Sequence, residues 1–236
     1  MDLQSPFAEF TGRGVRVAII DSGVNPAHPH VGGVAGGVGI SASGESENYL
    51  DYAGHGTAVA GAIREKAPDA LLFAVKVFDQ DLRTNAETIV RAMEWAVENR
   101  MQIVNLSLGT INPSHRDLFE RVVVKAVERN VAFLAAGEML GQPAFPGCLP
   151  GAIAVGVDWE CPRETYRVAP GPCFLTSGYP REIPGVPREY NLSGISFAVA
   201  NMTGYAARAR EAYPTASVAE LKELLQEHGL DHRFGH

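Results

Sequence analysis

Short apolar runs alternate with longer amphipathic segments along most of the chain, and this alternation restricts the fold more than any other feature. The short runs are typical of buried strands, and the longer segments have helical spacing of their apolar residues. Strands that alternate with helices form a mostly parallel, twisted sheet with helices on both faces, so the sequence predicts a three-layer α/β fold. The expected strands are 15–20, 71–77, 103–108, 131–136 and 152–157, and the expected helices are 56–66, 87–99, 118–128, 196–213 and 217–227.

We expect a single domain over residues 1–236. This length is enough for one α/β domain with a sizeable core, and no repeat, low-complexity tract or linker divides the chain. Ser217 stands directly before the last expected helix and Glu220 follows three residues later, a spacing that predicts a capping box.

Charge and hydropathy argue against several classes of protein. The formal net charge of -7 disfavours a nucleic-acid partner, because binding a polyanion needs a basic face. No run of about 18 apolar residues occurs, so no membrane span is expected. Residues 1–10 have neither the basic nor the apolar region of a secretory signal, so we expect a cytoplasmic protein. A secreted mature fragment is the alternative.

The cysteines give no sign of a metal site. Cys148, Cys161 and Cys173 are odd in number, and their spacing fits no zinc pattern. We interpret them as three reduced thiols, and one disulfide with a free thiol is the alternative.

Three polar residues stand where a parallel sheet places its ligand sites, at the carboxyl ends of strands. Asp21 ends an apolar run, His55 lies between two glycines directly before a helix, and Ser196 opens an apolar helix. An aspartate can hold an imidazole, histidine transfers protons near neutral pH, and a helix N-terminus suits a serine nucleophile and the oxyanion it generates. Each residue alone also fits a plain structural role at a turn or a helix start.

In combination, the motifs resemble the subtilase family of serine proteases (peptidase family S8). The chain order Asp…His…Ser is that of the subtilisin branch. TGRGVRVAIIDSGV (residues 11–24) resembles the family's Asp motif, GHGTAVAG (54–61) its His motif, and YNLSGISFA (190–198) its nucleophile motif. The likeness extends over residues 11–213, in the same order as in the family.

The resemblance implies a serine endopeptidase that acts through an acyl-enzyme, with Asp21 orienting His55 and His55 activating Ser196. Residues 104–109 resemble the edge strand that pairs with an extended peptide or protein substrate. Residues 135–137 resemble a wall of the primary specificity pocket. The implied substrate-binding residues are Ser107, Leu108, Gly109, Ala135, Ala136 and Gly137.

Glu138 departs from the family pattern, which has an oxyanion-binding Asn after Ala-Ala-Gly. The segment from Glu138 to Phe145 is also shorter than usual. In one alignment Glu138 replaces the Asn, which predicts a slow enzyme in which Gln142 could supply a donor. In the other, the Asn is deleted and Glu138 borders the primary pocket, which predicts a preference for Arg or Lys before the cut.

We expect no cofactor and no metal. Calcium stabilises many family members and is possible here by analogy, but no Asp-rich loop resembles a calcium cage. Asp79 and Asp81 are interpreted as a solvated pair, and the irregular His228, His232 and His236 as a disordered tail.

The leading hypothesis is a compact intracellular or peptide-maturation protease with a non-standard oxyanion site. The alternative is a weak or inactive pseudoprotease that binds an extended peptide, which Glu138 favours and the intact Asp-His-Ser set disfavours. An esterase or transpeptidase with the same residues is a third hypothesis. The sequence leaves the oligomeric state open.

Overall fold

A computed structural model describes residues 5–78, 83–171 and 173–231, and one large sheet dominates it. The strands of this sheet are β1 (Arg16–Asp21), β2 (Gly36–Ser41), β3 (Gly44–Ser46), β4 (Leu71–Lys76), β5 (Ile103–Leu106), β6 (Ala132–Ala136), β9 (Ile153–Val157), β10 (Arg167–Ala169), β11 (Cys173–Thr176) and β12 (Leu230–Asp231). Their order is β12-β10-β11-β9-β6-β5-β1-β4-β2-β3. Neighbouring strands are parallel, apart from the antiparallel pairs β10–β11 and β2–β3.

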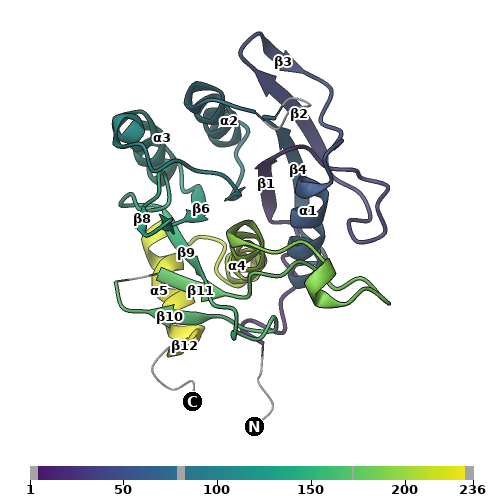
Figure 1. Cartoon of the computed structure of the whole chain (residues 1–236). Coiled ribbons are helices and arrows are strands. Elements are labelled where there is room, and N and C mark those ends of the chain that lie inside the picture. Colours follow the sequence, from purple (N-terminus) through teal and green to yellow (C-terminus); the bar gives the residue numbers. More distant parts are fainter. Residues whose placement is uncertain (1–4, 79–82, 172, 232–236) are drawn as a thin grey trace.

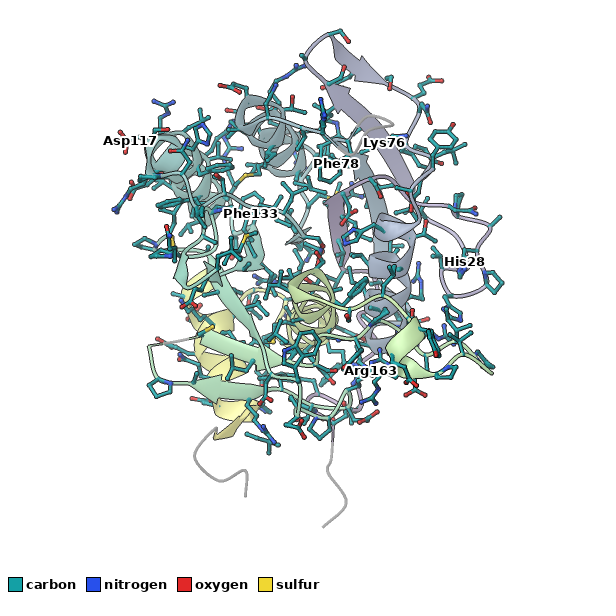
Figure 2. All side chains as sticks on the ribbon, in the orientation of Figure 1. His28, Lys76, Phe78, Asp117, Phe133 and Arg163 are labelled. Atoms are coloured by element: carbon teal, nitrogen blue, oxygen red, sulfur yellow. The ribbon has the colours of Figure 1, made fainter. Side chains whose placement is uncertain are left out.

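Helices cover both faces of the sheet, which confirms the three-layer α/β prediction (Figure 1). They are α1 (His55–Lys66), α2 (Ala86–Glu98), α3 (Arg116–Glu128), α4 (Ile195–Ala212) and α5 (Val218–His228), with short 3-10 helices at Pro113–His115 and Arg188–Tyr190. In β1, Val17 and Ile19 pack toward α1 and α4, whereas Ala18 and Ile20 pack toward α2 and α3. This alternation follows from the two-residue period of a strand. Phe133 lies in the second of these cores (Figure 2).

Every predicted strand and helix is present, with ends that differ by about two residues or fewer. The capping box is confirmed: Glu220 N–H donates to Ser217 Oγ at 3.2 Å, and Ser217 N–H donates to the Glu220 carboxylate at 2.7 Å. The prediction of reduced thiols is confirmed, since all three cysteines are free. Within the described residues, no helix has the length and apolar character needed to cross a membrane.

The prediction of an edge strand ending at Ser107–Gly109 is wrong. β5 stops at Leu106 and lies between β1 and β6, inside the sheet. All four of its residues are buried, as expected for a parallel strand that is covered on both faces. Ser107–Gly109 therefore forms a loop beyond the end of an internal strand. Asp79, Asp81, His232 and His236 lie outside the described residues. His228 is the last residue of α5 and its ring stacks on Phe7, so the interpretation as part of a disordered tail is wrong for this residue.

A buried ion cluster holds the end of α1. The guanidinium of Arg163, which is labelled in Figure 2, donates to both carboxylate oxygens of Glu65, and Lys66 Nζ donates to Glu65 at 2.9 Å. Burial by itself would raise the pKa of Glu65, but Arg163 and Lys66 outweigh it and hold that pKa below its usual value. Loss of one partner would leave a buried charge uncompensated, which is strongly destabilising.

Helices α1 and α4 approach each other closely at Gly204. A Cβ added at this glycine would lie 2.4 Å from Lys66 Cβ, too close for two real carbon atoms. The contact matters for the rest of the molecule because α1 begins at His55 and α4 begins at Ile195, next to Ser196.

We predict that Gly204→Ala destabilises the protein, although alanine normally stabilises a helix interior by about 1 kcal/mol relative to glycine. Overpacking against Lys66 costs about 1–3 kcal/mol, so the free energy of unfolding should fall. Urea denaturation followed by circular dichroism measures the change. An increase in the free energy of unfolding would show that the helices separate without cost.

Candidate active site

Asp21 and His55 meet at the carboxyl edge of the sheet. Asp21 is the last residue of β1 and is fully buried, and His55 is the first residue of α1. The His55 Nδ1–H donates to Asp21 Oδ1 at 2.7 Å. Gly56 permits this approach, because a Cβ there would lie 2.1 Å from the Gly23 carbonyl oxygen and 3.1 Å from Asp21 Oδ1.

The surroundings of His55 favour the protonated imidazole. The hydrogen bond that His55 donates to Asp21 raises the pKa of His55 above its usual value, against the opposing effect of burial. The negative charges of Asp21 and Asp51 raise it further. An imidazole in this setting is a better proton acceptor than one in water, with its Nδ1–H held in a fixed direction.

Ser196 lies in the first turn of α4, and its Oγ–H donates to the carbonyl oxygen of Ser107 at 3.1 Å. Among the described residues, no hydrogen bond joins Ser196 Oγ to His55. The next residue, Phe197, contacts the His55 ring at a centroid distance of 5.6 Å, so serine and histidine share one site. Catalytic hydrogen bonds are often long before substrate binds, so this geometry suits a nucleophile and base at rest.

A buried chain of hydrogen bonds fixes Ser107 relative to α4. Thr203 Oγ1 donates to Asn105 Oδ1 at 3.0 Å, and Asn105 Nδ2 donates to Ser107 Oγ at 2.6 Å. Thr203 and Asn105 are fully buried, so these bonds are shielded from water. The loop that accepts from Ser196 is thus connected to the helix that carries Ser196.

Hydrogen bonds also connect the N-terminal half of α4 to the end of β11 and to the segment that follows it. Asn201 Nδ2 donates to the carbonyl oxygens of Ser177 at 2.9 Å and Tyr179 at 3.1 Å. Thr176 Oγ1 donates to the Ala198 carbonyl at 2.8 Å. These bonds give Asn201, which is buried in α4, a structural role.

The predicted substrate-binding residues divide into two groups. Ala135 and Ala136 are buried in β6, and Gly137 N–H donates to the Val155 carbonyl at 3.0 Å. Leu108 and Gly109, in contrast, are partly exposed, and their main-chain groups make no hydrogen bond within the described part of the chain. The latter are therefore free to pair with an extended peptide.

Glu138 and Gln142 lie on the two strands of a small hairpin, β7 (Glu138–Met139) and β8 (Gln142–Pro143), in which Glu138 pairs with Pro143 and Gln142 with Met139. Both residues are exposed, and in the described structure neither side chain makes a hydrogen bond. Glu138 borders a cavity of about 840 Å³ that also reaches Ile195, the neighbour of Ser196. Burial raises the pKa of Cys173 in this cavity, and the Glu138 charge raises it further.

Two features of the site were not predicted from the sequence. Met139 Sδ lies 3.7 Å from the position of a Cβ added at Gly109, so this side chain borders the loop Ser107–Gly109. Asp51 accepts several hydrogen bonds beside His55. The signal for Asp51 was available, since an acidic residue shortly before a helix stabilises its N-terminus.

The comparisons with known proteins agree with this geometry. The model of the subtilase family matches residues 12–236. The chain belongs to the subtilase family. This subtilase is 33% identical to subtilisin E of Bacillus subtilis over 92% of its own length and 61% of that relative. It is 33% identical to subtilisin BL of Lederbergia lenta, covering 95% of this chain and 87% of the relative.

Solved structures show the same fold. Sphericase superimposes on this subtilase with a TM-score of 0.73 at 26% identity, covering 96% of this chain and 85% of the other. A cold-adapted subtilisin-like serine proteinase gives the same TM-score at 22% identity, covering 92% and 83% of the two chains. The chain spans about three fifths of the length of subtilisin E, whose sequence is therefore longer than the matched domain.

We predict that Asp21→Asn lowers the pKa of His55, because it removes the charge and the strong acceptor that stabilise the imidazolium. The pH dependence of the His55 ring carbon shifts in NMR spectra measures this change. His30 is the internal control: burial lowers its pKa, followed by the charges of Arg181 and His28, and it does not depend on Asp21. An unchanged titration of His55 would contradict the coupling.

Proposed function

We propose that this subtilase is a serine endopeptidase with Ser196 as nucleophile, His55 as general base and Asp21 as the residue that orients His55. The observation that carries the proposal is the 2.7 Å hydrogen bond between His55 and Asp21, next to a serine at a helix N-terminus. Names of relatives such as subtilisin E support the same activity.

The reaction follows from these positions. His55 Nε2 accepts the proton of Ser196 as Oγ attacks the scissile carbonyl, and Asp21 stabilises the imidazolium that forms. The Ser196 N–H, at the start of α4, would donate to the developing oxyanion, where the helix N-terminus favours negative charge. The imidazolium then gives its proton to the leaving amine. Water, activated by the same imidazole, hydrolyses the acyl-enzyme and frees Ser196.

An extended substrate would bind along the loop after β5, with the main chain of Leu108 and Gly109 as partners. Their unpaired groups support this arrangement, since an added peptide would supply the missing hydrogen bonds. The substrate would thus pair with a loop at the carboxyl edge and not with an edge strand.

Glu138 is proposed as a specificity residue. Its place at the border of the cavity next to Ile195 supports the alignment in which the oxyanion Asn is deleted. A carboxylate there complements an Arg or Lys side chain before the cut. The Ser196 N–H would then be the principal oxyanion donor, which favours slow turnover.

The cellular role is proposed as intracellular processing of a narrow set of peptides. Free thiols are typical of a reducing compartment, which supports an intracellular enzyme. The short hairpin at β7–β8 leaves a compact site, which suits selective processing better than general digestion.

We predict that a serine-reactive phosphonate labels the parent protein and that Ser196→Ala abolishes both labelling and peptide hydrolysis. The variant removes the only atom able to form the covalent adduct in the proposed mechanism. Intact-mass spectrometry measures the label. Ser193→Ala, in the preceding loop, is the matched control and should label normally. Absence of labelling in the parent would favour a peptide-binding pseudoprotease.

We predict that Glu138→Gln reduces the ratio of kcat/KM for Lys over Leu before the cut by about two- to fivefold, because the attraction between an exposed carboxylate and the substrate cation is lost. Peptide pairs that differ only at this residue measure the ratio. Glu128→Gln, an exposed carboxylate at the end of α3, is the control.

Glu138→Asn separates the two interpretations of this position. If Glu138 occupies the oxyanion position, Asn should increase kcat by about 10²–10³, a magnitude measured in subtilisin itself. If Glu138 borders the pocket, kcat for a Leu substrate should hardly change. A tenfold or greater increase would contradict the specificity assignment.

A further inference from the structure

Asp51 is a second carboxylate beside the base, four residues before His55. Its Oδ1 accepts hydrogen bonds from Ser22 Oγ at 3.0 Å and from the N–H groups of Ala53 and Gly54, both at 2.9 Å. Its Oδ2 accepts from Thr57 N–H at 2.9 Å and Thr57 Oγ1 at 2.6 Å. Hydrogen bonds therefore hold both carboxylate oxygens of Asp51.

The side-chain hydrogen-bond donors to Asp51 lie in two segments that flank the candidate base His55, the loop after β1 and the first turn of α1. Ser22 follows Asp21, and its Oγ also accepts from Gly56 N–H at 2.9 Å. Thr57 lies in the first turn of α1, and its Oγ1 also accepts from Asn25 N–H at 3.0 Å. Asp51 therefore links the loop after β1 to the first turn of α1, and His55 lies between these links.

Asp51 stays ionised over the pH range in which histidine titrates. Burial by itself would raise the pKa of Asp51, but the hydrogen bonds from Thr57, Gly54 and Ala53 outweigh it, and this pKa lies below its usual value. The carboxylate is therefore ionised at neutral pH. Its charge adds to that of Asp21 in raising the pKa of His55.

Other charged groups near Asp51 and His55 belong to neighbouring elements. Lys76 on β4 donates to the Leu50 carbonyl at 2.7 Å, and Asp51 partly offsets the lowering of its pKa by burial. His28, His30 and Arg181 line a cleft of about 650 Å³ together with Asp51. In the described structure, none of these four side chains makes a hydrogen bond to the Asp51 carboxylate, so its charge stays available to His55.

We propose that Asp51 is a positioning residue that fixes the first turn of α1, directs His55 toward Asp21, and stabilises the imidazolium formed during acyl transfer. This inference rests on the proposed peptidase activity. It assigns the basicity of His55 to two carboxylates with different roles. Asp21 contacts the ring directly, and Asp51 acts through the backbone and through its charge.

Asp51→Asn tests the proposal. An amide can keep the three bonds to Oδ1, but it removes the charge and directs N–H groups against Thr57 N–H. We expect kcat to fall about tenfold with little change in KM, because the imidazolium exists only along the reaction path. The acidic limb of the kcat/KM profile should move to lower pH, since His55 would stay neutral at lower pH than in the parent.

Two further variants separate the effect of the Asp51 charge from its effect on the position of His55. Thr57→Val removes the hydroxyl but keeps both the charge of Asp51 and the backbone donors, so kcat should fall while the pH profile stays in place. Asp117→Asn is the control, because it removes one charge from the first turn of α3, far from His28 (Figure 2). It should change neither kcat nor the pH profile of kcat/KM. Because Thr57→Val is the milder change, it tests the positioning role even where Asp51→Asn fails to fold.

NMR titration of His55 in the Ser196→Ala background gives a readout that needs no catalysis. The pKa of His55 should be lower when Asp51→Asn is added. An unchanged titration, or an unchanged kcat in Thr57→Val, overturns the inference even if Ser196 is essential for hydrolysis. If the parent hydrolyses no peptide, the proposed function fails, and the titration alone then decides whether Asp51 acts on His55.

Discussion

The close packing of α1 against α4 is the constraint on which the site depends. The candidate base opens α1 and the candidate nucleophile lies in the first turn of α4, so the separation of these helices sets the separation of the two side chains. Gly204 allows the aliphatic part of Lys66 to fill the space that a side chain would occupy. The sheet contributes a common edge where both helices begin. Neither Asp21 nor Ser107 could hold the reactive groups together if the helices moved apart.

Three carboxylates around this edge show how burial and donors give one chemical group different roles. Asp21 is fully buried and bonds directly to the imidazole. Asp51 is half-buried and is held by side-chain and backbone donors. Glu138 is exposed on a hairpin and borders a cavity. The first can orient a ring, the second can stabilise a helix start and a nearby cation, and the third can meet a substrate.

The sequence predicted the helices and the central strands because they are long, apolar and strongly periodic. It did not predict β2, in which glycines replace the β-branched residues that favour strands, or the short strands β3, β10, β11 and β12. Asp21, His55 and Ser196 were recognisable because each lies in a local motif at the end of a strand or the start of a helix. Ser107–Gly109 was misplaced as an edge strand, because strand order is decided by contacts between distant segments that a local pattern does not contain.

The direction of Glu138 could not follow from the sequence either. The direction of a residue after Ala-Ala-Gly depends on the path of the chain beyond the strand, which a local motif does not specify. In this subtilase the chain turns back at once through Leu140 and Gly141, and residue 138 pairs with residue 143. The hairpin directs one of its side chains, Met139, toward Gly109 and leaves Glu138 at the cavity. The tight turn thus leaves an exposed carboxylate at the border of the cavity.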